Sequence, residues 1–220
     1  MLAADLISDN IPPIKPSDTG VKAMKWMDEF RVSHLPIVDG RKLLGIISDN
    51  DILDLESPDQ PIEKFLGDFD LVSVTADKHY YEVLKIISEE HLSVIPVIDK
   101  DGNYIGSIAV NQMIEKLANV AAVNEPGSIL ILDVKPVDYS LSQIAQIVES
   151  NDAKVLSMYI SNNMDNGLDV TLKVNKPEIN GVIQTFQRYG YNIKSTFQIN
   201  NYFQEDMKSR YEGLMNFLNL

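Results

Sequence analysis

One unit occurs twice in this chain of 220 residues, with a spacing of about sixty residues. The first copy reads HLPIVD at residues 34–39 and GIISDND at residues 45–51, and the second reads VIPVID at residues 94–99 and GSIAVNQ at residues 106–112. Such self-similarity indicates the duplication of one supersecondary unit. Because neither copy offers much core on its own, we expect the two copies to pack against each other.

Both copies predict the same order of elements, which is an extended piece, a helix, two strands around a turn and a short helix. In the first copy, the strands are expected at residues 35–38 and 43–47 and the short helix at residues 49–55. The second copy has its corresponding elements at residues 71–74, 95–98, 104–108 and 111–119. We therefore predict a βαββα-like unit in residues 1–60 and another in residues 61–122.

The longer helix of each copy should have a capped start and an apolar inner face. Ser17 or Asp18 is expected to cap the helix of the first copy, and Asp77 that of the second. The apolar residues expected on the inner faces are Val21, Met24, Met27 and Phe30 in the first copy, and Tyr80, Val83, Leu84 and Ile87 in the second.

The hydrophobic pattern changes after the Glu125-Pro126-Gly127 segment, which marks a domain boundary. Residues 126–200 predict the order βαββαβ, which is a ferredoxin-like split βαβ arrangement. Its strands and helices are expected at residues 129–134, 139–150, 154–161, 168–174, 177–189 and 193–199. A last amphipathic helix is expected within residues 201–220, with Met207, Tyr211, Leu214, Met215 and Leu218 on one face.

The repeated segments resemble those of a tandem pair of CBS domains, called a Bateman module. The nucleotide-binding pattern of that family, G-h-h-[ST]-x-x-[DN], is met by Gly45, Ile46, Ile47, Ser48 and Asp51. In the second copy, alanine and glutamine replace the hydroxyl and acidic residues at positions 109 and 112. Residues 126–200 resemble an ACT domain, and the whole arrangement is similar to the acetoin-utilisation AcuB-type proteins. The resemblance implies an α+β fold with tandem CBS repeats, an ACT-type domain and a C-terminal helix.

The GIISDND segment has residue types suited to an adenosine ligand. Gly45 allows a close approach, Ser48 lies where a helix start favours an anion, and Asp51 offers two acceptors for a ribose diol. The adenine is expected between the strands, against aliphatic groups such as Ile37 and Ile47. The alternative is purely structural, because Ser48 and Asp51 also form an S-x-x-[DE] helix start.

Further candidates for the site lie beside Pro36, which has no backbone N–H to donate within a sheet. Either the neighbouring backbone stays free to bind a ligand, or the proline protects a sheet edge from pairing. His34 and Leu35 precede it, and the resemblance implies that backbone at these two residues reads an adenine edge. Weaker candidates are Lys15, Arg31, Ser73, Thr75 and Asn111. Two interpretations of the second copy stay open. Its cleft is either empty or filled by packing, or it forms a second nucleotide site.

Composition limits the function classes. The net charge of −13 argues against nucleic acid or an anionic membrane as partner, although a pocket for a small phosphate remains possible. The absence of cysteine excludes thiolate catalysis and zinc–thiolate sites, and the histidines lack metal-site spacing. The N-terminal sequence lacks the apolar core of a signal peptide, so we expect a cytoplasmic protein.

Three functions follow from these patterns. The first is a non-catalytic regulatory homodimer that binds AMP, ADP, ATP or S-adenosylmethionine without a cofactor and transmits the change to the ACT-like domain or to a regulated protein. The second is a structural or interaction protein with an empty cleft. The third, an enzyme, has no nucleophile–base pair, Walker loop or metal cluster in its favour, and we expect no catalytic residues.

Overall fold

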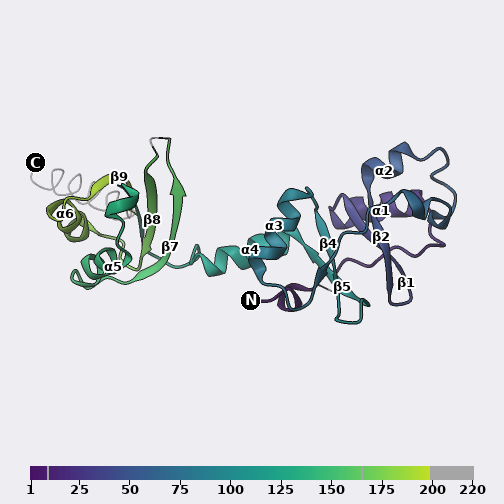
Figure 1. Ribbon diagram of the computed structural model, residues 1–220, viewed down its shortest axis with the longest axis horizontal. Helices are drawn as coiled ribbons and strands as arrows, with labels where there is room; N and C mark the ends of the chain where they lie inside the picture. Colours follow the sequence, from purple (N-terminus) through teal and green to yellow (C-terminus); the bar gives the residue numbers. More distant parts are fainter. Residues whose placement is uncertain (9, 165, 199–220) are drawn as a thin grey trace, which may run out of the picture. The chain divides into compact units, whose positions relative to one another are not determined.

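The computed structural model describes residues 1–8, 10–164 and 166–198 (Figure 1). It divides the chain into two compact units, Met1–Leu117 and Ala118–Leu220. The boundary falls near the end of the duplicated region, so both copies belong to the first unit. The amphipathic helix expected at residues 204–218 lies outside the described residues.

The first copy forms a helix, a hairpin and a short helix, as its pattern predicts. These elements are α1 (Gly20–Phe30), β1 (His34–Asp39), β2 (Lys42–Ser48) and α2 (Asp49–Asp54). The extended piece before α1 pairs with β1 in parallel, because the amide of Ile14 donates to the carbonyl of Pro36 and its carbonyl accepts from Val38, both at 2.8 Å.

The second copy repeats this order with β3 (Val74–Thr75), α3 (Tyr80–Glu89), β4 (Val94–Ile98), β5 (Tyr104–Ala109) and α4 (Val110–Val120). The strand order in its sheet is β3-β4-β5, with β3 parallel to β4 and β5 antiparallel to β4. Short 3-10 turns lie at η1 (Ala3–Leu6), η2 (Ile62–Asp68) and η3 (Pro136–Asp138).

The two copies share their hydrophobic cores. Val94 and Ala109 of the second copy lie in the cluster that contains Ile37 and Ile47, and Ile46 of the first copy lies in the cluster of the second. The expectation that the copies pack against each other is therefore confirmed.

The helix starts differ from those expected. Thr19 caps α1 by accepting from the amide of Lys22 at 3.2 Å, whereas the carboxylate of Asp18 is taken by the side chain of Lys22. His79 caps α3, because the carboxylate of Asp77 is engaged by the hydroxyl of Thr75.

The predicted inner faces are also partly wrong. Val21 on α1 and Leu84 on α3 are exposed, while Ala23 and Met27 are buried in α1. A step of three residues falls short of one turn, so a stripe at that spacing drifts around the helix.

The second unit has the predicted βαββαβ order. Its elements are β6 (Ser128–Val134), α5 (Leu141–Glu149), β7 (Val155–Asn162), β8 (Leu168–Val174), α6 (Asn180–Arg188) and β9 (Asn192–Phe197). The strand order β7-β8-β6-β9, with every pair antiparallel, is the ferredoxin-like one and confirms the expected topology.

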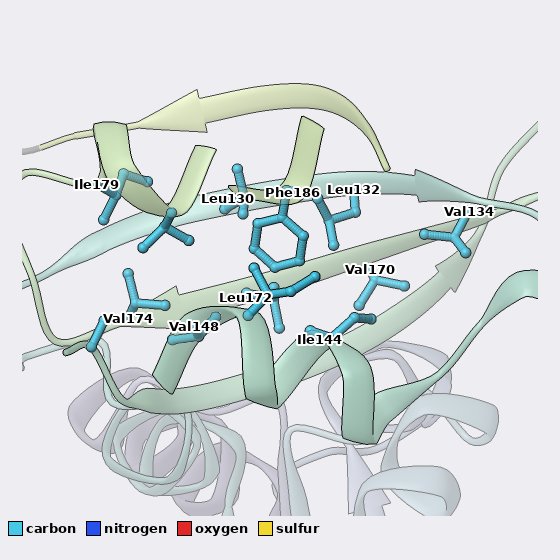
Figure 2. Packing of buried hydrophobic residues seen from close by; sticks show 13 residues of the cluster. Leu130, Leu132, Val134, Ile144, Val148, Val170, Leu172, Val174, Ile179 and Phe186 are labelled. Atoms are coloured by element: carbon cyan, nitrogen blue, oxygen red, sulfur yellow. The ribbon is translucent and has the colours of Figure 1, made fainter. Parts of the chain in front are cut away.

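The core of this unit lies between the sheet and its two helices. Figure 2 shows Phe186 of α6 and Ile144 of α5 among Leu130, Leu132 and Leu172 of the sheet. All five side chains are fully buried. The alternation of buried and half-buried residues along β6 follows from this one-sided packing.

Candidate functional site

The start of α2 is a reciprocal capping box. The hydroxyl of Ser48 accepts from the amide of Asp51 at 3.0 Å, and Oδ2 of Asp51 accepts from the amide and the hydroxyl of Ser48, both at 2.7 Å. The structure thus contains the helix cap that was the alternative interpretation of Ser48 and Asp51. Oδ1 of Asp51 has no hydrogen bond within the described chain, so it stays available to a ligand hydroxyl.

The aliphatic members of the predicted site lie in the core. Leu35 and Ile47 have no exposed surface, and Pro36 and Ile46 are buried as well. Ile37 is also fully buried. This corrects the expectation that an adenine lies against Ile37 and Ile47, because packing within the duplicated unit already covers these side chains.

The close approach expected at Gly45 is made by the chain itself. A Cβ at this position would lie 3.3 Å from the carbonyl oxygen of Asp70 and 3.3 Å from the Cβ of Phe69. The same carbonyl accepts from the amide of Ile46 at 2.9 Å. A larger residue at position 45 would press against the backbone of residues 69–70, so glycine serves this packing whether or not a ligand binds.

His34 joins the two copies. Its Nδ1 accepts from the amide of Ser93 at 3.2 Å and lies 3.1 Å from the hydroxyl of the same serine. The hydroxyl of Ser93 also accepts from the amide of Ser33 at 2.9 Å. Because Nδ1 accepts from an amide, the neutral ring carries its proton on Nε2.

Burial lowers the pKa of His34 below its ordinary value, since it removes water from the charged ring, and the carboxylates of Asp49 and Asp51 oppose this shift only in part. A histidine with a lowered folded pKa binds fewer protons in the folded than in the unfolded state. Its contribution to stability is then full above the unfolded pKa of about 6.5 and is lost as the pH falls through the folded pKa.

We therefore expect the first unit to lose stability between pH 7 and pH 5, in urea unfolding followed by the fluorescence of Trp26. His34→Gln keeps an acceptor for the amide of Ser93 but cannot titrate, so this variant should show a flatter dependence over the same range. Equal slopes for the two proteins would show that His34 does not carry the effect.

A hollow of about 1370 Å³ opens next to Ser33 and Ser93, and neither His34 nor any of the residues that match the nucleotide pattern lines it. Ser33 and Ser93 line it together with Asp49, the residue that follows Ser48. The rest of its lining comes largely from α1 and α2 and consists of Val21, Met24, Lys25, Met27, Asp28, Glu29, Arg31, Val32, Ile52, Leu53 and Pro58.

The weaker candidates are dispersed. Lys15, Ser73 and Thr75 do not line this hollow, and the hydroxyl of Thr75 is taken by Asp77. Arg31 does line it, and Arg31 and Asn111 both line a smaller hollow next to it.

Sequence reasoning missed Ser33 and Ser93. Each lies three residues before the proline of its copy, and that shared position was the available signal. The structure gives both a role, since they connect the copies through His34.

Among residues 1–8, 10–164 and 166–198, no group of three or more His, Asp or Glu is placed to hold a metal ion. No helix in the same residues has the length and apolar character needed to span a bilayer.

Comparison with protein-family models shows that the CBS domain matches residues 3–57 and 66–119. Among curated relatives, the inosine-5'-monophosphate dehydrogenase of Methanocaldococcus jannaschii is 21% identical over 164 residues, covering 74% of this chain and 33% of the relative. The chain thus spans about a third of the length of that enzyme.

Similarities to solved structures cover about half of the chain. A putative acetoin utilization protein (AcuB) from Vibrio cholerae has a TM-score of 0.49 and 23% identity, over 56% of this chain and 95% of that one. CBSX2, solved in complex with AMP, has a TM-score of 0.46 and 21% identity, over 54% of this chain and 97% of that one.

Proposed function

The chain belongs to the proteins that carry a tandem pair of CBS domains, and from this premise we propose that it is a non-catalytic regulatory protein that binds an adenosine-containing ligand. The observation that carries the proposal is the geometry at Asp51. One oxygen of its carboxylate is held by Ser48, and the other is unbonded within the described chain. A fixed carboxylate with one open oxygen suits a ribose hydroxyl.

The proposed binding site comprises the residues that match the nucleotide pattern together with His34, Leu35 and Pro36, and these residues have two different roles. Ser48, Asp51 and His34 are half-buried and supply polar groups, whereas Leu35, Pro36, Gly45, Ile46 and Ile47 form the buried support that fixes them. Because Ser33 and Ser93 come from different copies and line one hollow, a ligand there contacts both copies. It shifts their arrangement only if it binds one arrangement more tightly.

Calorimetric titration of AMP, ADP, ATP and S-adenosylmethionine tests this function. Asp51→Asn retains an acceptor for the amide of Ser48 but loses the charge, and we expect the best ligand to bind roughly tenfold to a hundredfold more weakly. Asp54→Asn, an exposed change on the same helix, is the matched control and should leave affinity unchanged.

Unchanged affinity in Asp51→Asn would remove Asp51 from the site. If no adenosine compound raised the thermal midpoint of the wild-type protein, the alternative of a structural protein with an empty cleft would replace the proposal, because a ligand that binds only the folded state must stabilise it.

We also propose that the chain forms a cytoplasmic homodimer. In this dimer, the second unit acts as an ACT-type domain and transmits the change caused by ligand binding to a regulated protein. Exposed Val21 and Leu53 in the first copy and Tyr81 and Ile114 in the second support pairing of the helices with a second copy. Light scattering on the purified chain decides between monomer and dimer.

A further inference from the structure

The four-stranded sheet of the second unit has an outer face, opposite the face that α5 and α6 cover. Among residues 121–164 and 166–198, α5 and α6 are the only α-helices. Both helices pack on the same side chains of the sheet, which include Leu130, Leu132 and Leu172 (Figure 2). Because successive residues of a strand point to opposite faces, the alternate residues of the same strands form the outer face.

The outer face carries apolar side chains across the sheet. One row of register partners crosses all four strands and contains Tyr159, Thr171, Ile131 and Ser195. In the next row, Ile129 of β6 pairs with Phe197 of β9. The side chains of Tyr159 and Phe197 are 61% and 57% exposed. Antiparallel sheets that face water on one side have polar residues there, so these rows indicate a face that packs against a further element.

The chain itself crosses one end of this face. The hydroxyl of Ser157 donates to the carbonyl of Ala121 at 2.8 Å, and Nζ of Lys173 donates to the carbonyl of Val123 at 2.9 Å. Ser157 and Lys173 are register partners on β7 and β8, in the row that ends at Phe197. Residues 121–123 therefore lie over the β7 and β8 side of that row, while Phe197 stays exposed on β9.

A buried acceptor without a donor lies on the same face. The carboxylate of Asp169 on β8 accepts from Lys194 through Oδ2, whereas its Oδ1 is buried and has no hydrogen-bond partner in the described chain. The neighbouring carboxylate of Asp133 is satisfied, because the side-chain amides of Asn163 and Asn192 donate to its two oxygens, both at 3.0 Å. Since an unpaired buried oxygen costs free energy, the element that covers this face should bring a donor.

The chain has a segment suited to this face within residues 199–220, which lie outside the described residues. Its sequence predicts a helix with an apolar stripe of Met207, Tyr211, Leu214, Met215 and Leu218. An isolated helix of this length is marginal in water, so the stripe needs an apolar surface. Tyr211 gives the stripe a hydroxyl donor that matches the acceptor at Asp169.

The position and length of the segment also fit the outer face. β9 ends at Phe197, so the chain leaves the sheet beside this face. Residues 198–206 can extend over about 30 Å, which is enough to reach any of the four strands. A helical stripe from Met207 to Leu218 is about 17 Å long. Four strands with a spacing of about 4.8 Å span about 14 Å between the outermost two.

We propose that the C-terminal segment folds back as a helix across the outer face of its own sheet. Its apolar stripe packs on Ile129, Ile131 and Phe197, and the hydroxyl of Tyr211 donates to Oδ1 of Asp169. The segment then completes the second unit and shields this face from other proteins.

Cross-linking in the full chain tests the proposal, because the protein has no native cysteine. Ile131→Cys in the middle of the face and Leu214→Cys in the middle of the stripe are combined and treated with a short bis-maleimide. We expect a cross-link within one chain, identified by mass spectrometry of the digested monomer. Ile131→Cys with Asn216→Cys is the matched control, since residue 216 lies on the opposite side of the expected helix, and it should give little cross-link.

A charge on the stripe gives a second readout. Leu214→Glu would place a carboxylate against the apolar face, and we expect the thermal midpoint of the second unit in scanning calorimetry to fall by more than about 4 °C. Asn216→Glu adds the same charge on the opposite side of the expected helix and should shift the midpoint by less than about 2 °C.

Three results would overturn the proposal. Cross-links between chains instead of within one chain would show that a second copy covers the face. Equal cross-linking of the Leu214→Cys and Asn216→Cys pairs, or none in either, would show that the stripe does not lie on this face. Equal midpoints in Leu214→Glu and Asn216→Glu would show that the stripe is not buried against any surface.

Discussion

Gly127→Ala is expected to unfold the second unit or to lower its free energy of unfolding by more than about 3 kcal/mol. Gly127 has φ 157°, which L residues rarely adopt, and a Cβ there would overlap the carbonyl oxygen of Val174 on the neighbouring strand. That oxygen belongs to backbone within a four-stranded sheet, so it cannot rotate away as a flexible side chain would. Gly127 immediately precedes β6, and the strain falls where the central strand begins.

Gly190→Ala is the matched control. Gly190 also has a positive φ, of 80°, but no atom lies within 4 Å of the position of its Cβ. Only the backbone cost remains, which is about 1 kcal/mol. Hydrogen exchange of peptides from β6 and β8 measures both variants, since the single tryptophan lies outside this unit. Equal protection in the two variants would show that the overlap with Val174 is relieved by a local shift.

The duplication made most of the architecture of the first unit predictable from sequence. Matching segments at a fixed spacing required matching elements, and the hairpins and short helices appear where the pattern placed them. The sheet topology of the second unit could be predicted from the order of its helices and strands, because a βαββαβ chain allows few strand orders.

Side-chain roles were less predictable, because they depend on neighbours distant in sequence. Gly45 was expected to admit a ligand or backbone, and only the fold shows that Asp70 takes the space. Arg31 and His91 are separated by sixty residues and carry no motif, so their shared hollow depends on how the copies pack. The helices α1 and α3 are capped one and two residues after the predicted positions, because the carboxylates of Asp18 and Asp77 bind Lys22 and Thr75.

The contrast between GIISDND and GSIAVNQ changes meaning in the structure. The polar copy satisfies its own helix start with Ser48 and Asp51, so part of its polarity is structural. The second copy lacks such a cap, and the first residues of α4 line a small hollow together with Arg31 of the first copy and His91. Part of the contrast between the two copies is therefore a difference in how their short helices begin.

Ile95→Ala is expected to lower the free energy of unfolding of the whole first unit by about 2–5 kcal/mol. Ile95 has no exposed surface and lies in the cluster that Ile46 of the first copy joins. Trp26 lies on α1 of the first copy, so its fluorescence in urea reports the response of one copy to a cavity made in the other.

The shared cores predict that the transition at Trp26 shifts as far as the transition of the second copy, followed by hydrogen exchange in β4 and β5. Leu71→Ala removes similar aliphatic atoms from an exposed position of the second copy, and this control should change stability by less than about 0.5 kcal/mol. A normal Trp26 transition in Ile95→Ala would mean that the copies fold independently. The hydrogen bonds between His34 of the first copy and Ser93 of the second would then not couple the unfolding of the two copies.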